Sequence, residues 1–230
     1  MKAIGFDLGK TLITYEGVPL NWESLYEKAL EAVLVRCGLK IDKERIVVGK
    51  QILSKYNTRI NYREYEVSAN QIFEEILDAW DLNNNYLSSS KAEFFSYFQQ
   101  NSKLYEDTIA TLQKLKELNI KIGILTDVPY GMDKNYVLKD IEQFKEYIDV
   151  VLTSVDVGYR KPHINGFTEL SKCLGVSSSD MIFIGDEPKD IIGANKSEMF
   201  SVLINRTRDD INYGQRKTIN SLTELLDIVK

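Results

Sequence analysis

The sequence predicts an α/β protein: a doubly wound, Rossmann-like parallel sheet that carries a second, mainly α-helical domain. Two observations lead to this fold class. Short apolar runs alternate with helical patterns over most of the chain, as strands buried on both faces of a parallel sheet do. One long stretch near the amino terminus breaks this alternation, because it is rich in amphipathic helical pattern and no comparably strong apolar run interrupts it.

Five apolar runs are the expected strands. Each is short and apolar, and can be a strand buried on both faces. The runs are Ala3–Phe6, Ile120–Leu125, Val150–Thr153, Met181–Ile184 and Phe200–Ile204. The expected helices of the same unit are Tyr105–Leu118, Val137–Tyr147, Asn165–Leu174, Asp190–Asn195 and Ser221–Val229.

Residues 15–102 form the expected helical insertion, and residues 1–14 and 103–230 form the expected core. Apolar residues recur at helical spacing in this insertion, which predicts helices with one buried face. Examples are Trp22-Leu25-Ala29-Leu30-Val33 and Ile72-Ile76-Leu77-Trp80. We expect both tryptophan rings to pack inside the insertion.

Composition and charge favour a small ligand. The chain of 230 residues has a formal charge of −5 and no run rich in lysine or arginine, which argues against a general role in binding nucleic acid or a membrane surface. Cys37 and Cys173 suggest neither a disulfide framework nor a cysteine metal site, so a reducing cytoplasm is expected. The amino terminus, with Asp7 in its first apolar stretch, is typical of a buried strand and not of a signal peptide.

The single histidine, His163, narrows the chemistry. A site with several histidine ligands is excluded, and a Ser-His-Asp triad is improbable because only this residue is available as its base. Carboxylates, lysines and hydroxyl groups are the expected reactive groups, and His163 is expected to be a loop residue without a catalytic role.

Polar side chains follow the expected strands where each strand ends. Asp7 follows the first strand, Thr126 and Asp127 follow the second, and Asp186 follows Met181–Ile184 and Gly185. Since the carboxyl ends of parallel strands line the ligand crevice, we expect these side chains to converge. Lys161, in a loop after the third strand, adds a cation.

The segment AIGFDLGKTLI, Ala3 to Ile13, allows three interpretations. A phosphate-binding loop of the form GxxxxGK[ST] needs its first glycine at position 4, where the chain has Ile4. The DLGKT turn is similar to one in actin-like ATPases and sugar kinases, but those proteins need two sizeable lobes, which 230 residues with this insertion do not provide. The third interpretation makes Asp7 a nucleophile.

Four ordered motifs resemble those of the haloacid dehalogenase superfamily of hydrolases. They are Asp7 in DLGKT, Thr126 after IKIGIL, Lys161 in KPHINGF, and GDEPKD from Gly185 to Asp190. The flanking segments LQKLKELNIKIGILTD and TINSLTELLDI also look like this family. The resemblance implies a doubly wound core with a helical cap inserted after the first motif, which agrees with the insertion expected from the helical patterns.

The resemblance also implies a mechanism for a magnesium-dependent phosphatase of small phosphorylated metabolites. Asp7 is then the nucleophile that forms an aspartyl-phosphate. Asp7, Asp186 and the backbone carbonyl of Gly9 are the implied Mg²⁺ ligands, and Asp190 orients that group and belongs to the metal site.

The remaining implied roles concern the phosphate. Thr126 donates a hydrogen bond to a phosphoryl oxygen, and Lys161 supplies positive charge. Gly9, Lys10, Thr11 and Asp127 are the expected substrate-binding residues. We expect a monomer or a homodimer.

Gly9 departs from the usual DxDxT motif, whose second aspartate protonates the leaving group. Water, Lys10 or a cap residue can replace it, which is the favoured interpretation. A dehalogenase without magnesium conflicts with the pair Asp186 and Asp190. A phosphonate-cleaving enzyme needs a cap lysine, for which five are unassigned: Lys28, Lys40, Lys43, Lys50 and Lys55. The second overall interpretation is a phosphate-binding relative with little or no catalysis.

A basic, aromatic cluster in the insertion contains Tyr56, Arg59, Tyr62 and Arg63. Such a cluster can face the crevice and select a substrate. We interpret it instead as a helix surface on which arginines extend their apolar stems and keep their charges in water.

Overall fold

A computed structural model, which describes residues 1–99 and 102–229, has the predicted α/β fold with a six-stranded parallel sheet. The strand order is β5-β4-β1-β6-β7-β8, so the first strand lies in the middle of the sheet. The strands are β1 (Ala3–Phe6), β4 (Lys121–Thr126), β5 (Val150–Thr153), β6 (Met181–Gly185), β7 (Phe200–Ile204) and β8 (Lys217–Ile219). All five predicted strands are present, and β8 is an additional edge strand.

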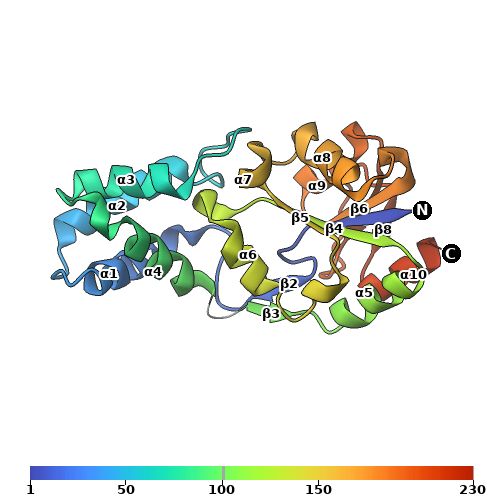
Figure 1. Cartoon of the computed structure of the whole chain (residues 1–230), viewed down its shortest axis with the longest axis horizontal. Coiled ribbons are helices and arrows are strands. Elements are labelled where there is room, and N and C mark those ends of the chain that lie inside the picture. Colours follow the sequence, from blue (N-terminus) through green and yellow to red (C-terminus); the bar gives the residue numbers. More distant parts are fainter. Residues whose placement is uncertain (100–101, 230) are drawn as a thin grey trace.

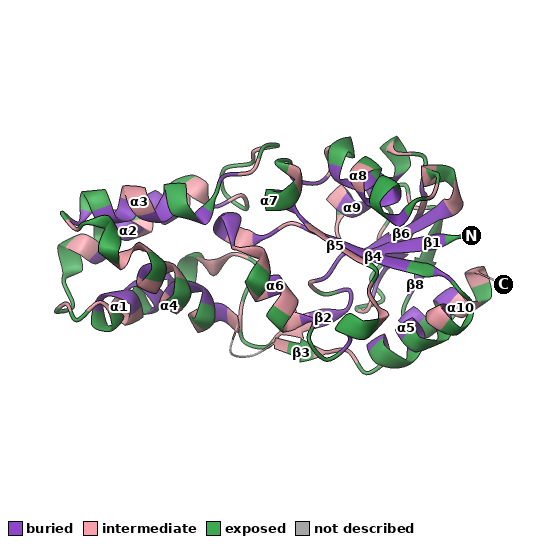
Figure 2. Cartoon of the chain, viewed as in Figure 1, coloured by how far each residue is buried: buried purple, intermediate pink, exposed green. Residues whose placement is uncertain are grey.

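Helices cover both faces of this sheet (Figure 1). On one face lie α8 (Ile164–Leu174) and α9 (Pro188–Lys196), and on the other lie α5 (Thr108–Glu117) and α10 (Leu225–Ile228). The short helix α7 (Ser154–Val157) follows β5, and α6 (Lys134–Asp140) follows β4. Central strands β1 and β6 are buried along their whole length (Figure 2), because helices pack on both of their faces.

Two predicted helices are shorter than expected. The pattern at residues 137–147 belongs to α6 and to a separate 3₁₀ turn, Lys145–Tyr147; the buried side chains of Ile141 and Phe144 lie between them. The pattern at residues 221–229 divides into the 3₁₀ turn Leu222–Glu224 and α10.

The stretch between the first two sheet strands is helical. It contains α1 (Tyr26–Arg36), α2 (Lys43–Tyr56), α3 (Ala69–Ala79) and α4 (Leu87–Gln99), with 3₁₀ turns at Trp22–Leu25 and Asn84–Tyr86. These helices form a separate layered unit at one end of the molecule, away from both termini (Figure 1). A two-stranded antiparallel ribbon, β2 (Ile13–Tyr15) with β3 (Ser102–Leu104), lies where the chain leaves the core and returns to it.

The insertion touches the core through a loop as well as through this ribbon. The segment between α2 and α3 pairs with the segment before Lys161: Arg160 N donates to Glu64 O at 2.7 Å, and Glu66 N donates to Gly158 O at 2.9 Å. Gly131, which has a φ of +61°, lies so close to this segment that a Cβ there would be 1.9 Å from Val67 O. Within the described residues, no helix is long and apolar enough to cross a membrane.

Candidate active site

The predicted strand-end residues converge on one cavity of about 420 Å³. Asp7 follows β1, Thr126 ends β4, and Asp186 follows β6; all three line the cavity. They meet because the three strands are parallel neighbours in matched register: Phe6 pairs with Ile124 on one side and with Ile184 on the other.

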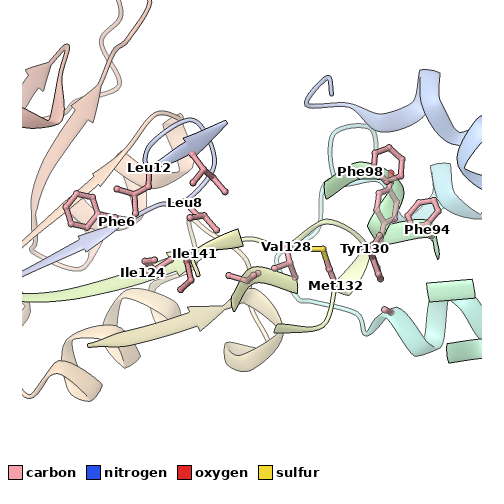
Figure 3. Close-up of a cluster of buried hydrophobic side chains, with 14 of the residues drawn as sticks. Phe6, Leu8, Leu12, Phe94, Phe98, Ile124, Val128, Tyr130, Met132 and Ile141 are labelled. Atoms are coloured by element: carbon pink, nitrogen blue, oxygen red, sulfur yellow. The ribbon is translucent and has the colours of Figure 1, made fainter. Parts of the chain in front are cut away.

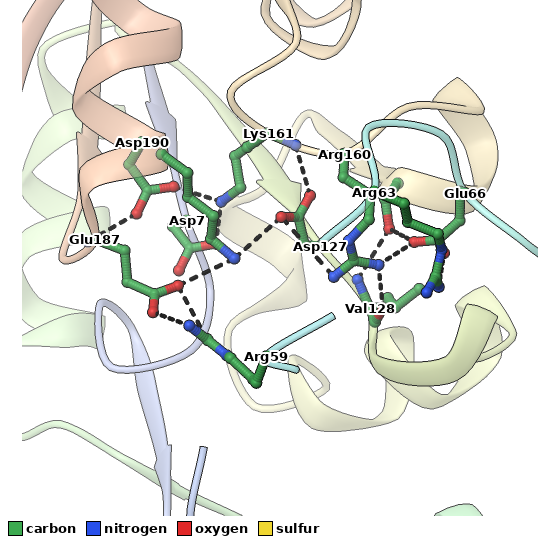
Figure 4. A network of polar contacts seen from close by, with 12 residues as sticks. Asp7, Arg59, Arg63, Glu66, Asp127, Val128, Arg160, Lys161, Glu187 and Asp190 are labelled. Carbon is green, nitrogen blue, oxygen red and sulfur yellow. Dashed lines mark hydrogen bonds and ion pairs between the residues drawn. The ribbon is translucent and has the colours of Figure 1, made fainter. Parts of the chain in front are cut away.

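Lys161 links two buried carboxylates at the floor of this cavity (Figure 4). Its Nζ donates to Asp7 Oδ1 at 2.5 Å and to Asp190 Oδ1 at 2.6 Å. A third bond runs to the backbone oxygen of Leu125 at 3.2 Å. The lysine side chain is 1% exposed, so its charge is held beside Asp7 with little screening by water.

Helix α9 presents Asp190 to this lysine from its first turn. Asp190 Oδ2 accepts a hydrogen bond from Glu187 N at 3.0 Å, and this bond closes the helix amino terminus. Gly185 makes the approach possible, because a Cβ at this position would lie 2.3 Å from the Asp190 carboxyl carbon. The sequence GDEPKD therefore directs one carboxylate of the motif toward Lys161.

The charged groups of the cavity change one another's pKa values. Burial alone would lower the pKa of Lys161, but Asp190, Asp7 and Asp127 raise it above its ordinary value, so the lysine stays protonated. Burial raises the pKa of Asp7 to about 6, although Lys161 acts to lower it. Burial, followed by the negative charges of Asp7 and Asp190, raises the pKa of Asp186 to about 8.

Asp7, Asp186 and Asp190 together fit a divalent cation. One oxygen from each lies within 4.8 Å of the others. Within the described part of the chain, the Asp186 carboxylate has no hydrogen-bond donor, whereas Asp190 is already held by Lys161 and a backbone N–H. Closely spaced carboxylates with too few donors are the hard oxygen ligands that Mg²⁺ takes in proteins.

Asp127 holds the loops around the cavity together. Its Oδ1 accepts from Lys161 N at 3.0 Å, and its Oδ2 lies 3.0 Å from Lys189 Nζ. Burial acts to raise the pKa of this carboxyl, but Lys189, Arg160 and Lys161 hold it well below its usual range. Asp127 lines the cavity as an ionised residue whose partners are protein groups.

Three other expected contact residues lie in the turn after β1. Gly9 and Lys10 line the cavity, and Lys10 adopts a φ of +56° that directs the turn back toward Ile13. Thr11 differs from the expectation: it is fully buried, its Oγ1 is closed off from solvent, and its carbonyl accepts from Arg206 Nη2 at 2.8 Å. Thr11 is not among the residues that line the cavity, because the turn buries its side chain.

We expected the aromatic, basic cluster of the insertion to form a helix surface, and this expectation is wrong. Tyr56 ends α2, and Arg59 and Tyr62 lie in the loop that follows; all three line the cavity. Arg59 forms a two-fold ion pair with Glu187, at 2.5 Å and 3.1 Å. The long loop after α2 brings these residues over the carboxylates, a placement that helical periodicity does not encode.

Arg63, the fourth member of this cluster, has a side chain that is only 9% exposed and lies away from the cavity lining. It donates to Tyr56 O at 2.7 Å and to Glu66 Oε1 at 3.1 Å. Its role in the loop is therefore structural.

Glu187 and Lys189 are site residues that sequence reasoning missed. Both line the cavity, and Lys189 Nζ lies 3.0 Å from both Glu187 Oε2 and Asp127 Oδ2. Both residues belong to the motif GDEPKD, and this membership was the signal in the sequence that could have identified them as site residues.

The five unassigned lysines of the insertion do not line the cavity in the described part of the chain. Lys50 pairs with Glu27, and Lys55 pairs with Glu75. Lys28, Lys40 and Lys43 are exposed. The phosphonate-cleaving interpretation therefore lacks the lysine that it requires near the site.

Known proteins are similar to this chain in sequence. A glyceraldehyde 3-phosphate phosphatase from Methanocaldococcus jannaschii is 34% identical over 136 residues, which cover 55% of this chain and 56% of that protein, so the match spans about half the length of this relative. The enzyme of the same name from Methanothermobacter thermautotrophicus is 24% identical over 89% of this chain and 86% of its own length.

Solved structures superpose on this protein over the full length of the chain. A haloacid dehalogenase phosphatase from Thermococcus onnurineus superposes with a TM-score of 0.67 and 27% identity, covering 100% of this chain and 98% of its own. A 2-haloacid dehalogenase from Pseudomonas syringae has a TM-score of 0.69 over the same shares at 20% identity, and shows the fold alone. The family model for haloacid dehalogenase-like hydrolases matches residues 22–204. With its sheet, its four motifs and this match, the chain belongs to the haloacid dehalogenase-like hydrolases.

Proposed function

We propose that the protein is a magnesium-dependent phosphatase that hydrolyses small phosphate monoesters through an aspartyl-phosphate on Asp7. The observation that carries this proposal is the placement of Asp7 between Lys161, at 2.5 Å, and the carboxylates of Asp186 and Asp190. A nucleophile beside a fixed cation and a cation-binding group is suited to attack on an anionic phosphoryl group. The relatives named as phosphatases support this class of reaction.

In the first step, one carboxylate oxygen of Asp7 attacks phosphorus, and the bond from phosphorus to the ester oxygen breaks. Lys161 and the Thr126 hydroxyl, which both line the cavity, stabilise negative charge on the phosphoryl oxygens. The departing alkoxide takes a proton from water, because Gly9 supplies no acid. Water then attacks phosphorus, inorganic phosphate leaves, and the Asp7 carboxylate is restored.

Asp7, Asp186 and the Gly9 carbonyl are the proposed ligands of Mg²⁺, and Asp190 orients them through Lys161. Bound there, the ion would neutralise phosphoryl charge and the mutual repulsion of the carboxylates. The raised pKa values of Asp7 and Asp186 support this assignment, since they reflect buried negative charge that a divalent cation would offset.

Residues 15–102 act as the cap domain in this proposal, and residues 1–14 and 103–230 act as the catalytic core. Support comes from the cavity itself, because its lining includes Trp22, Tyr56 and Arg59 from the insertion together with Asp7 and Lys161 from the core. Such a cover excludes bulk water from the reacting groups and contacts the organic part of the substrate.

The test is release of inorganic phosphate from a panel of organic phosphates, with Mg²⁺ and with EDTA, for the intact protein, Asp7→Asn and Asp186→Asn. We expect metal-dependent turnover that both substitutions reduce by at least about a thousandfold, since each removes a group that acts at phosphorus. Glu117→Asn, at an exposed position on α5, is the control. Phosphate binding without turnover on any ester would favour a non-catalytic phosphate-binding protein instead.

A further inference from the structure

The cavity has two chemically different ends. Near Asp7 it is lined by charged side chains, among them Lys161, Lys189 and Arg59. Toward the insertion it is lined by Val18, Trp22, Phe98, Tyr130 and Met132. Figure 3 shows Phe98 and Tyr130 lying together, with Val128 and Met132 between them and Leu8, the residue next to Asp7.

The far wall is a packed aromatic surface. The Trp22 ring stacks on Phe98 with ring centroids 3.8 Å apart and an interplanar angle of 7°. Tyr130 approaches Trp22 at 5.6 Å and Phe94 at 5.8 Å. Phe98 and Tyr130 are almost fully buried. These buried rings fix the half-buried Trp22 ring in place, so its free surface is offered to a ligand at little cost in conformational entropy.

Three tyrosine hydroxyl groups of this wall already have protein partners. Tyr15 Oη donates to Asp140 Oδ2 at 2.5 Å, and Tyr56 Oη donates to Glu75 Oε2 at 2.6 Å. The hydroxyl of Tyr130 is hydrogen-bonded to that of Tyr26.

The amide nitrogens of this part of the lining are also committed, whereas the buried Gln99 Oε1 has no hydrogen-bond partner within the described residues. Asn57 Nδ2 donates to Asn21 and to Tyr26, and its Oδ1 accepts from Arg59 N. Gln99 Nε2 donates to Tyr136 O and to Asp140. Thr58 and Tyr62, from the loop after α2, also line the cavity.

A substrate hydroxyl placed against this wall would lose its hydrogen bonds to water and find few replacements. An apolar group placed there would leave water for a surface of ring faces and methyl groups, which is favourable. We propose that the substrates are monophosphate esters of apolar alcohols, alkyl or aryl, and not sugar or polyol phosphates. This inference rests on the proposed function, because it assigns the phosphate to the charged end.

The first test measures binding and needs no turnover. Calorimetric titration of the intact protein with ethyl-, butyl- and hexylphosphonic acid in Mg²⁺ keeps the anion constant and lengthens the apolar part. We expect Kd to fall by about fourfold for each added methylene group. A Kd that does not change with chain length would overturn the inference.

The second test compares butyl phosphate with glycerol 1-phosphate and glyceraldehyde 3-phosphate. All three are esters of primary alcohols, so the difference lies mainly in the polarity of the organic part. We expect kcat/KM to be at least about tenfold higher for butyl phosphate. Equal or better turnover of the polar esters would contradict the proposal. If no ester is hydrolysed while phosphonate binding still tightens with chain length, the proposed function fails and the ligand class stands.

Two variants locate the effect. Trp22→Ala removes the ring that stacks on Phe98, and Val18→Thr places a hydroxyl at nearly constant volume. Both should weaken hexylphosphonate binding by about fivefold or more and leave ethylphosphonate binding within twofold. Val47→Thr, at a position on α2 that is 53% exposed, is the matched control. Equal losses for the short and long phosphonates would show that the aromatic wall does not contact the ligand, and circular dichroism checks folding.

Discussion

Arg160 donates a hydrogen bond from Nη1 to Glu66 Oε2, and this buried pair joins the helical insertion to the loop that carries Lys161. The side chains are 7% and 2% exposed. Glu66 Oε2 also accepts from Ser154 Oγ at 2.6 Å, and Arg160 Nη1 also donates to Val128 O at 2.9 Å. The Glu66 carboxylate of the insertion therefore binds Ser154 at the start of α7 and the Arg160 side chain, which in turn holds Val128 next to Asp127 (Figure 4).

Glu66→Gln should lower the free energy of unfolding by about 3–5 kcal/mol, because it removes the buried charge that pairs with both Arg160 and Arg63 and leaves Arg160 only Asp127, at 4.0 Å. The turnover number should fall as well, since the loop before Lys161 loses its anchor. Urea unfolding and phosphate release measure the two effects. Glu117→Gln, whose ion pair with Lys114 is half-exposed, should change stability by less than about 1 kcal/mol. Equal stability of the two variants would show that the buried pair contributes nothing.

Gly9→Asp should increase kcat by on the order of 10²-fold, because it adds a general acid for the leaving oxygen. The position has room: a Cβ on Gly9 would meet no atom within 4 Å. Rates of phosphate release with a slow alkyl ester measure the gain. Gly9→Asn has the same shape without the acid and should show no gain. An equal rate for both variants would mean that protonation of the leaving group does not limit turnover.

Stability of the metal-free protein should fall as pH rises from about 5 to about 9. Burial raises the pKa of Asp7 to about 6 and that of Asp186 to about 8. A carboxyl with a raised folded-state pKa contributes stability that is fully present below its unfolded-state pKa and lost as pH rises through the folded-state value. Thermal melts in EDTA across this range, for the intact protein and Asp186→Asn, check the trend, which the variant should show less strongly.

Magnesium should reverse this trend, because the ligands must be ionised to bind it. Below pH 8, apparent affinity should weaken by up to about tenfold per pH unit, as Asp186 takes up a proton. The rise in Tm on adding Mg²⁺ should therefore be larger at pH 8.5 than at pH 6. A rise that does not depend on pH would place the ion elsewhere.

Arg59→Met should raise KM by about fivefold with little change in Tm. The residue joins the loop after α2 to Glu187 across the cavity, and its side chain is 37% exposed, so the pair contributes at most about 1 kcal/mol to stability. Its loss should free the loop from the core and weaken the cover over the substrate. Arg36→Met, at an exposed position on α1, is the control for a lost positive charge. An unchanged KM would show that this ion pair does not influence substrate binding.

Much of the sheet and part of the site follow from the sequence alone. The run Ala3–Phe6 is apolar throughout, which identifies a strand buried on both faces, and Asp7 directly after it must lie at the sheet's carboxyl edge. The same reasoning places Thr126 and Asp186 at that edge, because parallel strands end together. The placement of these residues needs only local sequence: the apolar pattern predicts the strand, and the end of the strand predicts where the next side chain lies.

Tertiary structure alone decided what surrounds that edge. The contacts of Lys161 with Asp7 and Asp190 span 154 and 29 residues of sequence, and no local pattern encodes them. We expected Arg59 on a helix surface, because an arginine beside tyrosines is equally compatible with a helix and with a loop. We expected Thr11 to contact the substrate together with Gly9 and Lys10, which line the cavity, but the turn at Lys10 reverses the chain and buries Thr11. Strands can be predicted from short-range periodicity in the sequence. The lining of a cavity depends instead on loops that are distant in the sequence and that meet only when the chain folds.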